Sequence, residues 1–364
     1  MGPNHLAVYL SNRCNLSCSY CYVSVNQGPA VRLSFEQLKS SVDYFYENVP
    51  SKDKKITFLG GEPFLDFPLF ERIVRYAREK GPEAILQTFT NGTLLTPERL
   101  EFLNAYEVYT TVSLDGKSGT NDRHRSFLKS GGSVFAAVME RLRDLLKPFL
   151  GVSLVFTSET VEELLSNIDF FYRMGFGRIT FNPELYEIWP QERLEVLAKV
   201  LQGFRRYYRS ILMNGRAFVV PILFSVLENA PKNRQGLKWW HDCHNVVLGP
   251  DGEFYACDKA LSFPIGEAGN QKVGNAREGM DWDRRSALLG EAVRVVEEGG
   301  WGEDESFCPM GVYFYSRQAG KDPSVLLDNF HKVSGIFAGE LERLASELEG
   351  DPRFQELYVH ARLV

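Results

Sequence analysis

The sequence lacks several features whose absence argues against whole classes of protein. Its 364 residues carry 41 basic and 47 acidic side chains, and no segment is dominated by Lys or Arg, which argues against a nucleic-acid binder with a basic surface. The longest apolar stretch, Phe218 to Leu227, contains Pro221 and Ser225 and falls far short of the ~20 residues of a membrane span. No basic leader with an apolar run begins the chain, so we expect a cytoplasmic protein that does not enter a membrane.

Cysteine is also scarce, and the positions of the cysteines matter more than their number. Six cysteines in 364 residues are too few for a disulfide scaffold. Three lie within eight residues, and the other three are far along the chain: Cys14, Cys18 and Cys21, then Cys243, Cys257 and Cys308. Cysteines that cluster in a reducing compartment usually bind metal or carry out redox chemistry.

Short β-rich runs alternate with segments of helical periodicity through the first half of the chain. The predicted strands are His5–Leu10, Lys55–Leu59, Ala84–Thr90, Val108–Leu114, Val152–Phe156 and Arg178–Asn182. The predicted helices between them are Phe35–Tyr46, Phe70–Arg78, Pro97–Leu103, Val134–Leu146 and Val161–Met174. This alternation predicts an α/β fold with a parallel sheet wrapped by helices, either a partial barrel or an open doubly wound sheet.

The rhythm changes after Asn182. A long helix is predicted over Pro190–Met213, and the turn Gly249–Gly252 between two short apolar runs predicts a β-hairpin. Residues 266–279 are expected to form a loop, and Ser324–Glu349 an amphipathic helix that covers the open side of the barrel. We therefore divide the chain into a barrel, a helical linker, a small α+β domain and a C-terminal helix, over residues 1–185, 186–235, 236–320 and 321–364.

The first three cysteines follow the first predicted strand with the spacing Cys-x3-Cys-x2-Cys. Thiolates this close in sequence can hold one cubane from a single loop, and three of them leave the fourth iron without a protein ligand. Zinc is an alternative, but a structural zinc site needs four ligands and only His5 lies nearby. A third alternative is that the cysteines are merely buried.

This spacing, with Tyr20 directly before the third cysteine, resembles the radical S-adenosylmethionine (SAM) enzymes, whose open iron chelates SAM. The run Gly60, Gly61, Glu62 and Pro63 resembles the family's Gly-Gly-Glu-Pro motif, whose backbone and acidic side chain meet the methionine ammonium. Two glycines let a main chain approach a ligand closely, and barrel ligands bind at strand ends.

Two further strand ends extend the resemblance. Asn91 in Thr-Asn-Gly-Thr and the run Ser113-Leu-Asp115-Gly resemble segments of the branch that contains anaerobic sulfatase-maturing and peptide-modifying enzymes. The resemblance implies that Ser113 lies near the SAM ribose and that Arg125 pairs with the SAM carboxylate, a geometry that suits a guanidinium fork. It also implies a TIM-like partial (β/α)6 barrel with a [4Fe–4S] cluster and SAM as cofactors.

The later cysteines follow the pattern Cys243-x8-Gly252-x4-Cys257, which resembles the opening of the SPASM and twitch domains that hold auxiliary iron–sulfur clusters. Only Cys308 remains, so a second cluster in this domain is excluded by ligand count. One auxiliary cluster with three thiolates is expected. Its fourth position is either open or taken by one of four nearby residues: His241, Asp242, His244 or Glu305. A zinc site and a twitch fold without a cluster stay open as alternatives.

Asp258 adjoins Cys257. In the sulfatase-maturing relatives, the Asp beside the corresponding cysteine is assigned as the base that takes a proton from the substrate radical, and the resemblance implies this role for Asp258. Such a carboxylate must reach the reacting group and have its pKa set by burial. The alternative is an Asp at a hairpin end that bonds to backbone amides.

The resemblance implies an enzyme that cleaves SAM reductively to a 5′-deoxyadenosyl radical and abstracts hydrogen from a peptide or protein side chain, which is oxidised or cross-linked. A reductant such as flavodoxin or ferredoxin would supply the electron. Because thirteen residues precede Cys14, we expect a peptide substrate to be recognised by a separate protein or by the catalytic pocket itself. The alternatives are a twitch-type enzyme acting on a sugar or cyclitol, and a non-enzymatic electron-transfer protein.

Overall fold

The structure is a computed structural model. It describes residues 3–129, 131–143, 150–215, 217–224, 243, 245–262, 264, 271–301 and 308–362. Four proposed ligands of the second metal site lie outside the described residues: His241, Asp242, His244 and Glu305.

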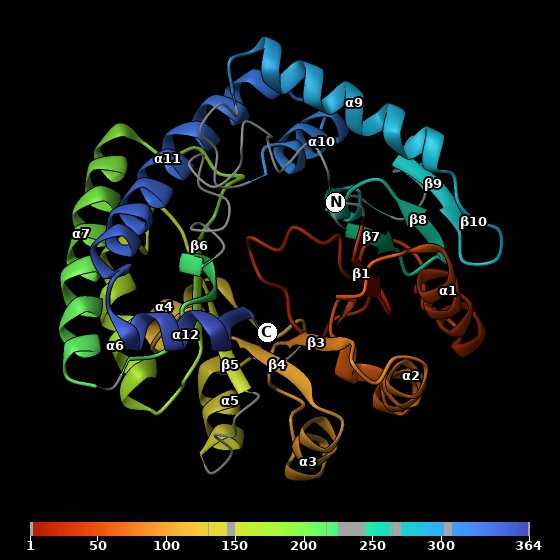
Figure 1. The fold of residues 1–364 in the computed structure, drawn as a ribbon, viewed down its shortest axis with the longest axis horizontal. Coiled ribbons are helices and arrows are strands. Elements are labelled where there is room, and N and C mark those ends of the chain that lie inside the picture. The colour runs from red at the N-terminus through yellow and green to blue at the C-terminus, as the bar shows by residue number, and fades with distance from the viewer. Residues whose placement is uncertain are drawn as a thin grey trace.

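The first half of the chain forms the predicted α/β partial barrel. Six parallel strands follow one another in sheet order, and helices cover their outer side (Figure 1). The strands are β1 (His5–Tyr9), β2 (Lys55–Leu59), β3 (Ile85–Thr90), β4 (Val108–Ser113), β5 (Leu150–Phe156) and β6 (Ile179–Pro183). The helices are α1 (Phe35–Asn48), α2 (Phe67–Lys80), α3 (Pro97–Ala105), α4 (Ser118–His124), α5 (Val134–Leu142), α6 (Leu164–Arg173) and α7 (Gln191–Met213).

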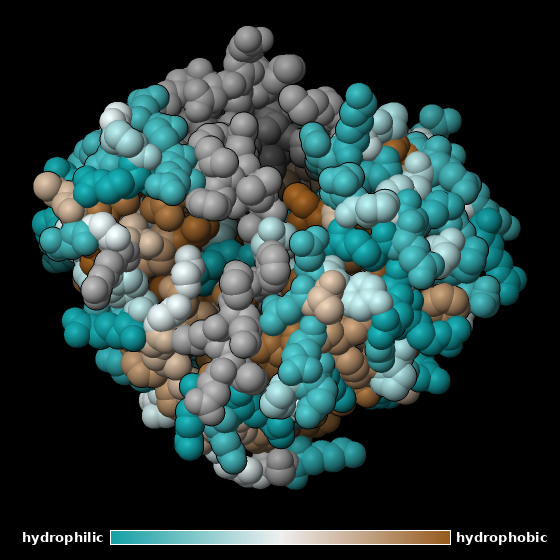
Figure 2. Space-filling model, turned by 60° about the horizontal axis from the view of Figure 1, so that its bottom comes forward, coloured by the Kyte–Doolittle hydropathy of each residue, from teal (hydrophilic) through white to brown (hydrophobic). Residues whose placement is uncertain are grey.

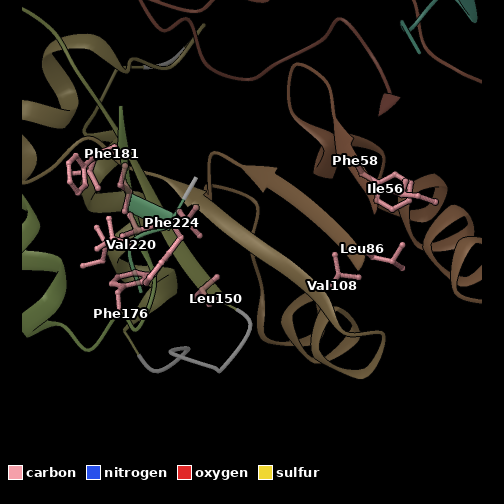
Figure 3. Packing of buried hydrophobic residues seen from close by; sticks show 14 of the residues in the cluster. Ile56, Phe58, Leu86, Val108, Leu150, Phe176, Phe181, Val220 and Phe224 are labelled. Atoms are coloured by element: carbon pink, nitrogen blue, oxygen red, sulfur yellow. The ribbon is translucent and has the colours of Figure 1, made fainter. Parts of the chain in front are cut away.

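Alternate residues of each strand separate the core from the barrel interior. Leu6 and Val8 of β1 are buried in the main core under the helices, whereas Ala7 and Tyr9 belong to a smaller cluster on the inner face. Figure 3 shows the outer core, with Ile56 of β2 packed toward α2. The helices therefore bury one side of the sheet, and the inner side is left for polar residues and ligands.

The second half of the chain continues the same sheet, which the predicted domain boundary did not anticipate. Strand β7 (Asn245–Leu248) pairs in parallel with β1, and the hairpin partner β8 (Glu253–Tyr255) follows it. Two short strands, β9 (Lys272–Asn275) and β10 (Gly279–Met280), replace part of the expected loop. Ten strands of the described residues thus form one sheet, in the order β10-β9-β8-β7-β1-β2-β3-β4-β5-β6.

The sequence predicts that the C-terminal helix covers the open side of the barrel, but in the structure the helix lies elsewhere. Helix α11 (Pro323–Leu348) packs along α7 and against α10 (Met310–Gln318), outside the last strands (Figure 1). Its Phe337 ring lies 6.0 Å from the ring of Phe156 and 5.8 Å from that of Phe181, centroid to centroid. Helices α9 (Trp282–Glu298) and α12 (Pro352–Arg362) complete the described chain.

The surface of the molecule is mainly polar. In the face drawn in Figure 2, hydrophilic residues surround smaller areas of apolar residues. No helix of the described residues has the length and apolar character to cross a membrane.

Phe337→Ala tests whether α11 is part of the barrel core. The Phe337 side chain is fully buried, so its loss should lower the free energy of unfolding by about 3–5 kcal/mol. Val325→Ala on the same helix, where the side chain is 59% exposed, should change it by less than about 0.5 kcal/mol. Denaturant unfolding followed by circular dichroism measures both. Equal stability of the two variants would show that α11 is only loosely attached.

Candidate active site at the strand ends

The first cysteine set lies in the loop between β1 and α1, and the end of β2 holds one side of this loop. Gly61 N donates to Ser11 O, and Glu62 N donates to Arg13 O, both at 2.8 Å. A Cβ atom on Gly61 would lie 2.1 Å from Arg13 O, closer than any van der Waals contact allows. Glycine is therefore required at position 61, because the backbone of the cysteine loop passes directly over it.

Asparagine side chains hold the loop from two other sides. Asn91, directly after β3, donates to Asn15 Oδ1 at 2.8 Å, and Asn15 donates to Thr93 Oγ1 at 2.8 Å. Within the loop, Asn26 accepts from Cys14 N at 3.1 Å and donates to Cys14 O at 3.0 Å. These bonds fix the backbone at the first cysteine, and the predicted site residue Asn91 takes part in them.

The three thiols point toward a common region. Burial, with smaller contributions from the charges of Glu62, Cys18 and Cys21, raises the pKa of Cys14 to about 12. Burial likewise raises the pKa of Cys18 to about 11, against the opposing effect of Arg125. Cys14 Sγ accepts from Leu16 N at 3.3 Å. Buried thiols that repel one another as thiolates need cationic partners, which metal ions supply.

The donor set fits an iron–sulfur cluster better than a single metal ion. No group of three His, Cys, Asp or Glu side chains in the described chain converges closely enough for one ion. In a cubane each thiolate binds a different iron, so the sulfur atoms stand farther apart, and N–H donors to the sulfurs are usual. The N–H group of Leu16 and the Asn91 amide, 3.8 Å from Cys14 Sγ, supply such donors.

A buried ion pair lies against the second cysteine. Arg125 Nε and Nη2 each donate to Asp115 at 2.9 Å, and Tyr20 also donates to Asp115. The guanidinium carbon lies 5.4 Å from the centre of the Tyr20 ring, and the guanidinium also donates to Cys18. The sequence predicted a pairing of Arg125 with the SAM carboxylate. In this structure Arg125 pairs with Asp115, because α4 turns the chain back toward the end of β4, and the pairing with SAM stays a prediction.

Glu62 and Pro63 lie at the end of β2, where the carboxylate ties two strand ends together. Glu62 Oε1 accepts from Thr90 Oγ1 at 2.7 Å, and Oε2 accepts from Asn91 N at 2.8 Å. Burial raises the pKa of this carboxyl to about 7 against these hydrogen bonds. The backbone of Gly60 and Gly61 is adjacent, and Ser113 ends β4, half-buried. The predicted SAM-binding residues therefore lie at carboxyl ends of strands or in the loops that follow them, except Arg125, which follows α4.

The second cysteine set also comes together. The charge of Cys243 raises the pKa of both Cys257 and Cys308, although burial is the larger cause for each. Cys308 Sγ accepts from the N–H groups of Met310 and Gly311 at the start of α10. Arg285 Nη2 donates to Cys243 O at 2.7 Å and so fixes the backbone there. Three half-buried thiols, two of them with nearby N–H groups, again match the donor set of an iron–sulfur site.

Asp258 lies between the two cysteine sets. The turn Asp258–Ser262 follows Cys257, and Ala260 and Leu261 pack on the inner face of β1. Leu261 O accepts from Ser24 N at 2.7 Å, which ties this turn to the first cysteine loop. Burial would raise the pKa of Asp258, but Lys259, 2.9 Å away, more than compensates and lowers it. Asp258 is therefore an ionised carboxylate able to accept a proton.

A cavity of about 280 Å³ opens beside Cys21, with Tyr22, Glu184 and Tyr315 among its lining residues. Glu184 follows β6, and Tyr315 lies on α10. Neither residue was a candidate from the sequence. The position of Glu184 after the last predicted strand was a usable signal, since barrel sites form at strand ends. Nothing in the sequence indicated that α10 brings Tyr315 to the same place.

The sequence profile of the radical SAM superfamily matches residues 8–171. An AdoMet-dependent heme synthase of Methanosarcina barkeri is 33% identical over 285 residues, which cover 72% of this chain and 77% of the relative. The chain belongs to the radical SAM superfamily. It is an enzyme of that superfamily, which uses a [4Fe–4S] cluster and SAM (AdoMet).

Other relatives modify proteins. A serine-type anaerobic sulfatase-maturating enzyme of Klebsiella aerogenes is 24% identical over 68% of this chain and 65% of its own length. The solved structure of native anSMEcpe with bound AdoMet and Cp18Cys peptide superposes with a TM-score of 0.69 at 21% identity, over 99% of both chains. The radical SAM barrel and the region that follows it thus have the same fold as that enzyme.

Gly61→Ala tests the contact between the β2 end and the cysteine loop. The added methyl group must displace the Arg13 backbone, so the reconstituted variant should lose the iron of the first cysteine set and its SAM affinity. Gly119→Ala is the matched control, since no atom lies within 4 Å of a Cβ there. Iron analysis and equilibrium binding of SAM measure the effect. Full iron content in Gly61→Ala would mean that the loop can move away without consequence.

Proposed function

We propose that this radical SAM enzyme abstracts hydrogen from a peptide or protein side chain and so oxidises or cross-links it. The observation that carries the proposal is the cavity between the first cysteine set and the Asp258–Ser262 turn, which Cys21 and Ser262 both line. Its volume of about 280 Å³ suits an amino-acid side chain rather than a whole large cofactor. The relatives named as sulfatase-maturating enzymes act, as their name says, on a protein.

In this proposal the first cysteine set holds the SAM-binding cluster. Cys14, Cys18 and Cys21 would be its ligands, and the residues at the strand ends would hold SAM: Tyr20, Gly60, Gly61, Glu62, Pro63, Asn91, Ser113, Asp115 and Arg125. In this structure several of these residues position neighbouring residues of the same set. Asp115 and Tyr20 hold Arg125 beside Cys18, and Glu62 holds Asn91 beside Cys14. These residues would orient the ligands of the cluster.

The second cysteine set, in a SPASM- or twitch-like domain, would hold one auxiliary iron–sulfur cluster through Cys243, Cys257 and Cys308. When bound, the first cluster would supply the electron for reductive cleavage of SAM to methionine and a 5′-deoxyadenosyl radical, and an auxiliary cluster would offer an acceptor for the electron that the substrate loses. Asp258 would take the proton released from the substrate, because its carboxylate stays ionised beside Lys259.

Replacing Cys14, Cys18 and Cys21 together with Ala should abolish formation of 5′-deoxyadenosine from SAM in the reduced enzyme. About four irons per chain should remain if the second set holds a cubane. Chromatography of the anaerobic reaction and iron analysis measure the two quantities.

The matched control replaces Cys243, Cys257 and Cys308 with Ala and should leave about four irons at the first set. Retained SAM cleavage in the first triple variant would contradict the assignment of the SAM-binding cluster. Iron near zero in that variant would contradict the auxiliary cluster.

Asp258→Asn should lower the yield of modified peptide per 5′-deoxyadenosine by about 10²–10⁴, because the substrate radical loses its proton acceptor. Mass spectrometry of the peptide and quantitation of 5′-deoxyadenosine give this ratio. Asp328→Asn, on the exposed face of α11, is the control and should not alter it. An unchanged ratio in Asp258→Asn would assign Asp258 to the hairpin structure alone.

A further inference from the structure

The cavity beside Cys21 has an unusual set of ionisable side chains. Glu184 and Glu187 both line it, and His124 is the remaining ionisable side chain of the wall apart from Cys21 and tyrosines. Among the described residues no Lys or Arg lines the cavity, and none forms an ion pair with either glutamate. The two cations behind the wall are already paired, Lys259 with Asp258 and Arg125 with Asp115, both at 2.9 Å. The cavity is therefore acidic.

The two carboxylates are poorly solvated. Burial and, to a smaller extent, the neighbouring charge of Glu187 raise the pKa of Glu184 to about 7. The hydrogen bond from Tyr186 N to Glu184 Oε1 at 2.8 Å and the charge of Lys259 oppose these effects. Burial also raises the pKa of Glu187. A cation that entered the cavity would stabilise both carboxylates in their ionised form.

Tyrosine rings form much of the remaining wall. Tyr186 and Tyr315 lie with their ring centroids 4.6 Å apart, and Tyr20 and Tyr22 belong to the cysteine loop opposite. The face of a tyrosine ring attracts ammonium and guanidinium groups. The molecule already uses these rings in this way, since Lys259 Nζ lies 3.6 Å from the centre of the Tyr22 ring and 6.0 Å from that of Tyr186.

The segment that carries the glutamates is held rigidly by α11. Asn329 donates to Glu187 O at 2.7 Å and accepts from Trp189 N at 2.8 Å. Trp189 Nε1 donates to Glu184 O at 2.9 Å. Asn329 is itself buried. The carboxylates are thus positioned before any ligand arrives, which lowers the entropic cost of binding.

We propose that this acidic tyrosine pocket binds a cationic group of the substrate, a lysine ammonium or an arginine guanidinium, beside Cys21. The inference rests on the proposed function, and it specifies the substrate as a peptide with a basic side chain at or next to the modified residue. Glu184 and Glu187 supply the charge complementarity, and the tyrosines contact the aliphatic stem and the cationic head.

The experiment uses the reconstituted, SAM-saturated enzyme under anaerobic conditions. N-acetyl-lysine amide, N-acetyl-arginine amide and the uncharged N-acetyl-norleucine amide are titrated separately by ligand-observed NMR. The two cationic probes should bind at least tenfold more tightly than the norleucine probe. Glu184→Gln and Glu187→Gln should each remove most of that difference, whereas Glu192→Gln, exposed at the start of α7, should preserve it. Equal affinities of the three probes for the wild-type enzyme would overturn the proposal.

SAM carries a cationic sulfonium and is the other source of positive charge at this site. SAM affinity is therefore measured in the same variants. If Glu184→Gln weakens SAM binding and leaves the preference for the lysine probe intact, the pocket serves SAM, and the proposal is wrong. A different result would contradict the proposed function. The enzyme would then modify no peptide in any assay, although the lysine probe still binds through Glu184.

Discussion

The buried ion pair of Arg125 and Asp115 is the contact on which the position of the cysteine loop depends. Asp115 follows β4 and also accepts from Val155 N of β5 at 3.0 Å, so one carboxylate joins two strand ends to Arg125 and Tyr20. A buried pair of this kind contributes little net stability, because desolvation of both charges offsets their attraction. The ion pair instead holds the cysteine loop in position. Loss of either partner would leave a buried charge beside Cys18 and free the loop from the barrel.

Glu62 holds the cysteine loop on its other side, through hydrogen bonds and without a cationic partner. Its carboxylate is bound to Thr90 and Asn91, and Asn91 in turn contacts the Cys14 sulfur. Ionising Glu62 above its raised pKa of about 7 places a negative charge near three thiolates. Arg125 compensates on the opposite side, beside Cys18. The two networks therefore set the charge around the cysteines as well as their geometry, and charge and hydrogen bonds to sulfur tune the potential of such sites.

The sequence predicted the elements whose cause is local. Strand Lys55–Leu59 was predicted with its observed bounds, because its apolar and β-branched run ends at Gly60, and the cysteine spacing lies within one loop. Contacts between distant segments could not be predicted. The pairing of Arg125 with Asp115 depends on α4, a seven-residue helix too short to show a periodicity. The pocket depends on Glu184 and Tyr315, which come together because α10 packs at this end of the barrel. The strand Lys272–Asn275 is too short and too polar to be distinguished from a loop in the sequence.

The extension of the sheet across β1 explains how one pocket comes to lie between the two cysteine sets. β1 carries the first set in the loop after it, and β7 pairs with its other edge in parallel register, His5 opposite Asn245. The hairpin then returns the chain to Cys257, and the turn at Asp258 crosses the inner face of β1 toward Ser24. A shift of this register by one residue would turn Val247 and Tyr255 away from the inner face and carry Asp258 with them. The pairing of β1 with β7 therefore fixes the spacing of the two thiol sets and the position of Asp258 between them.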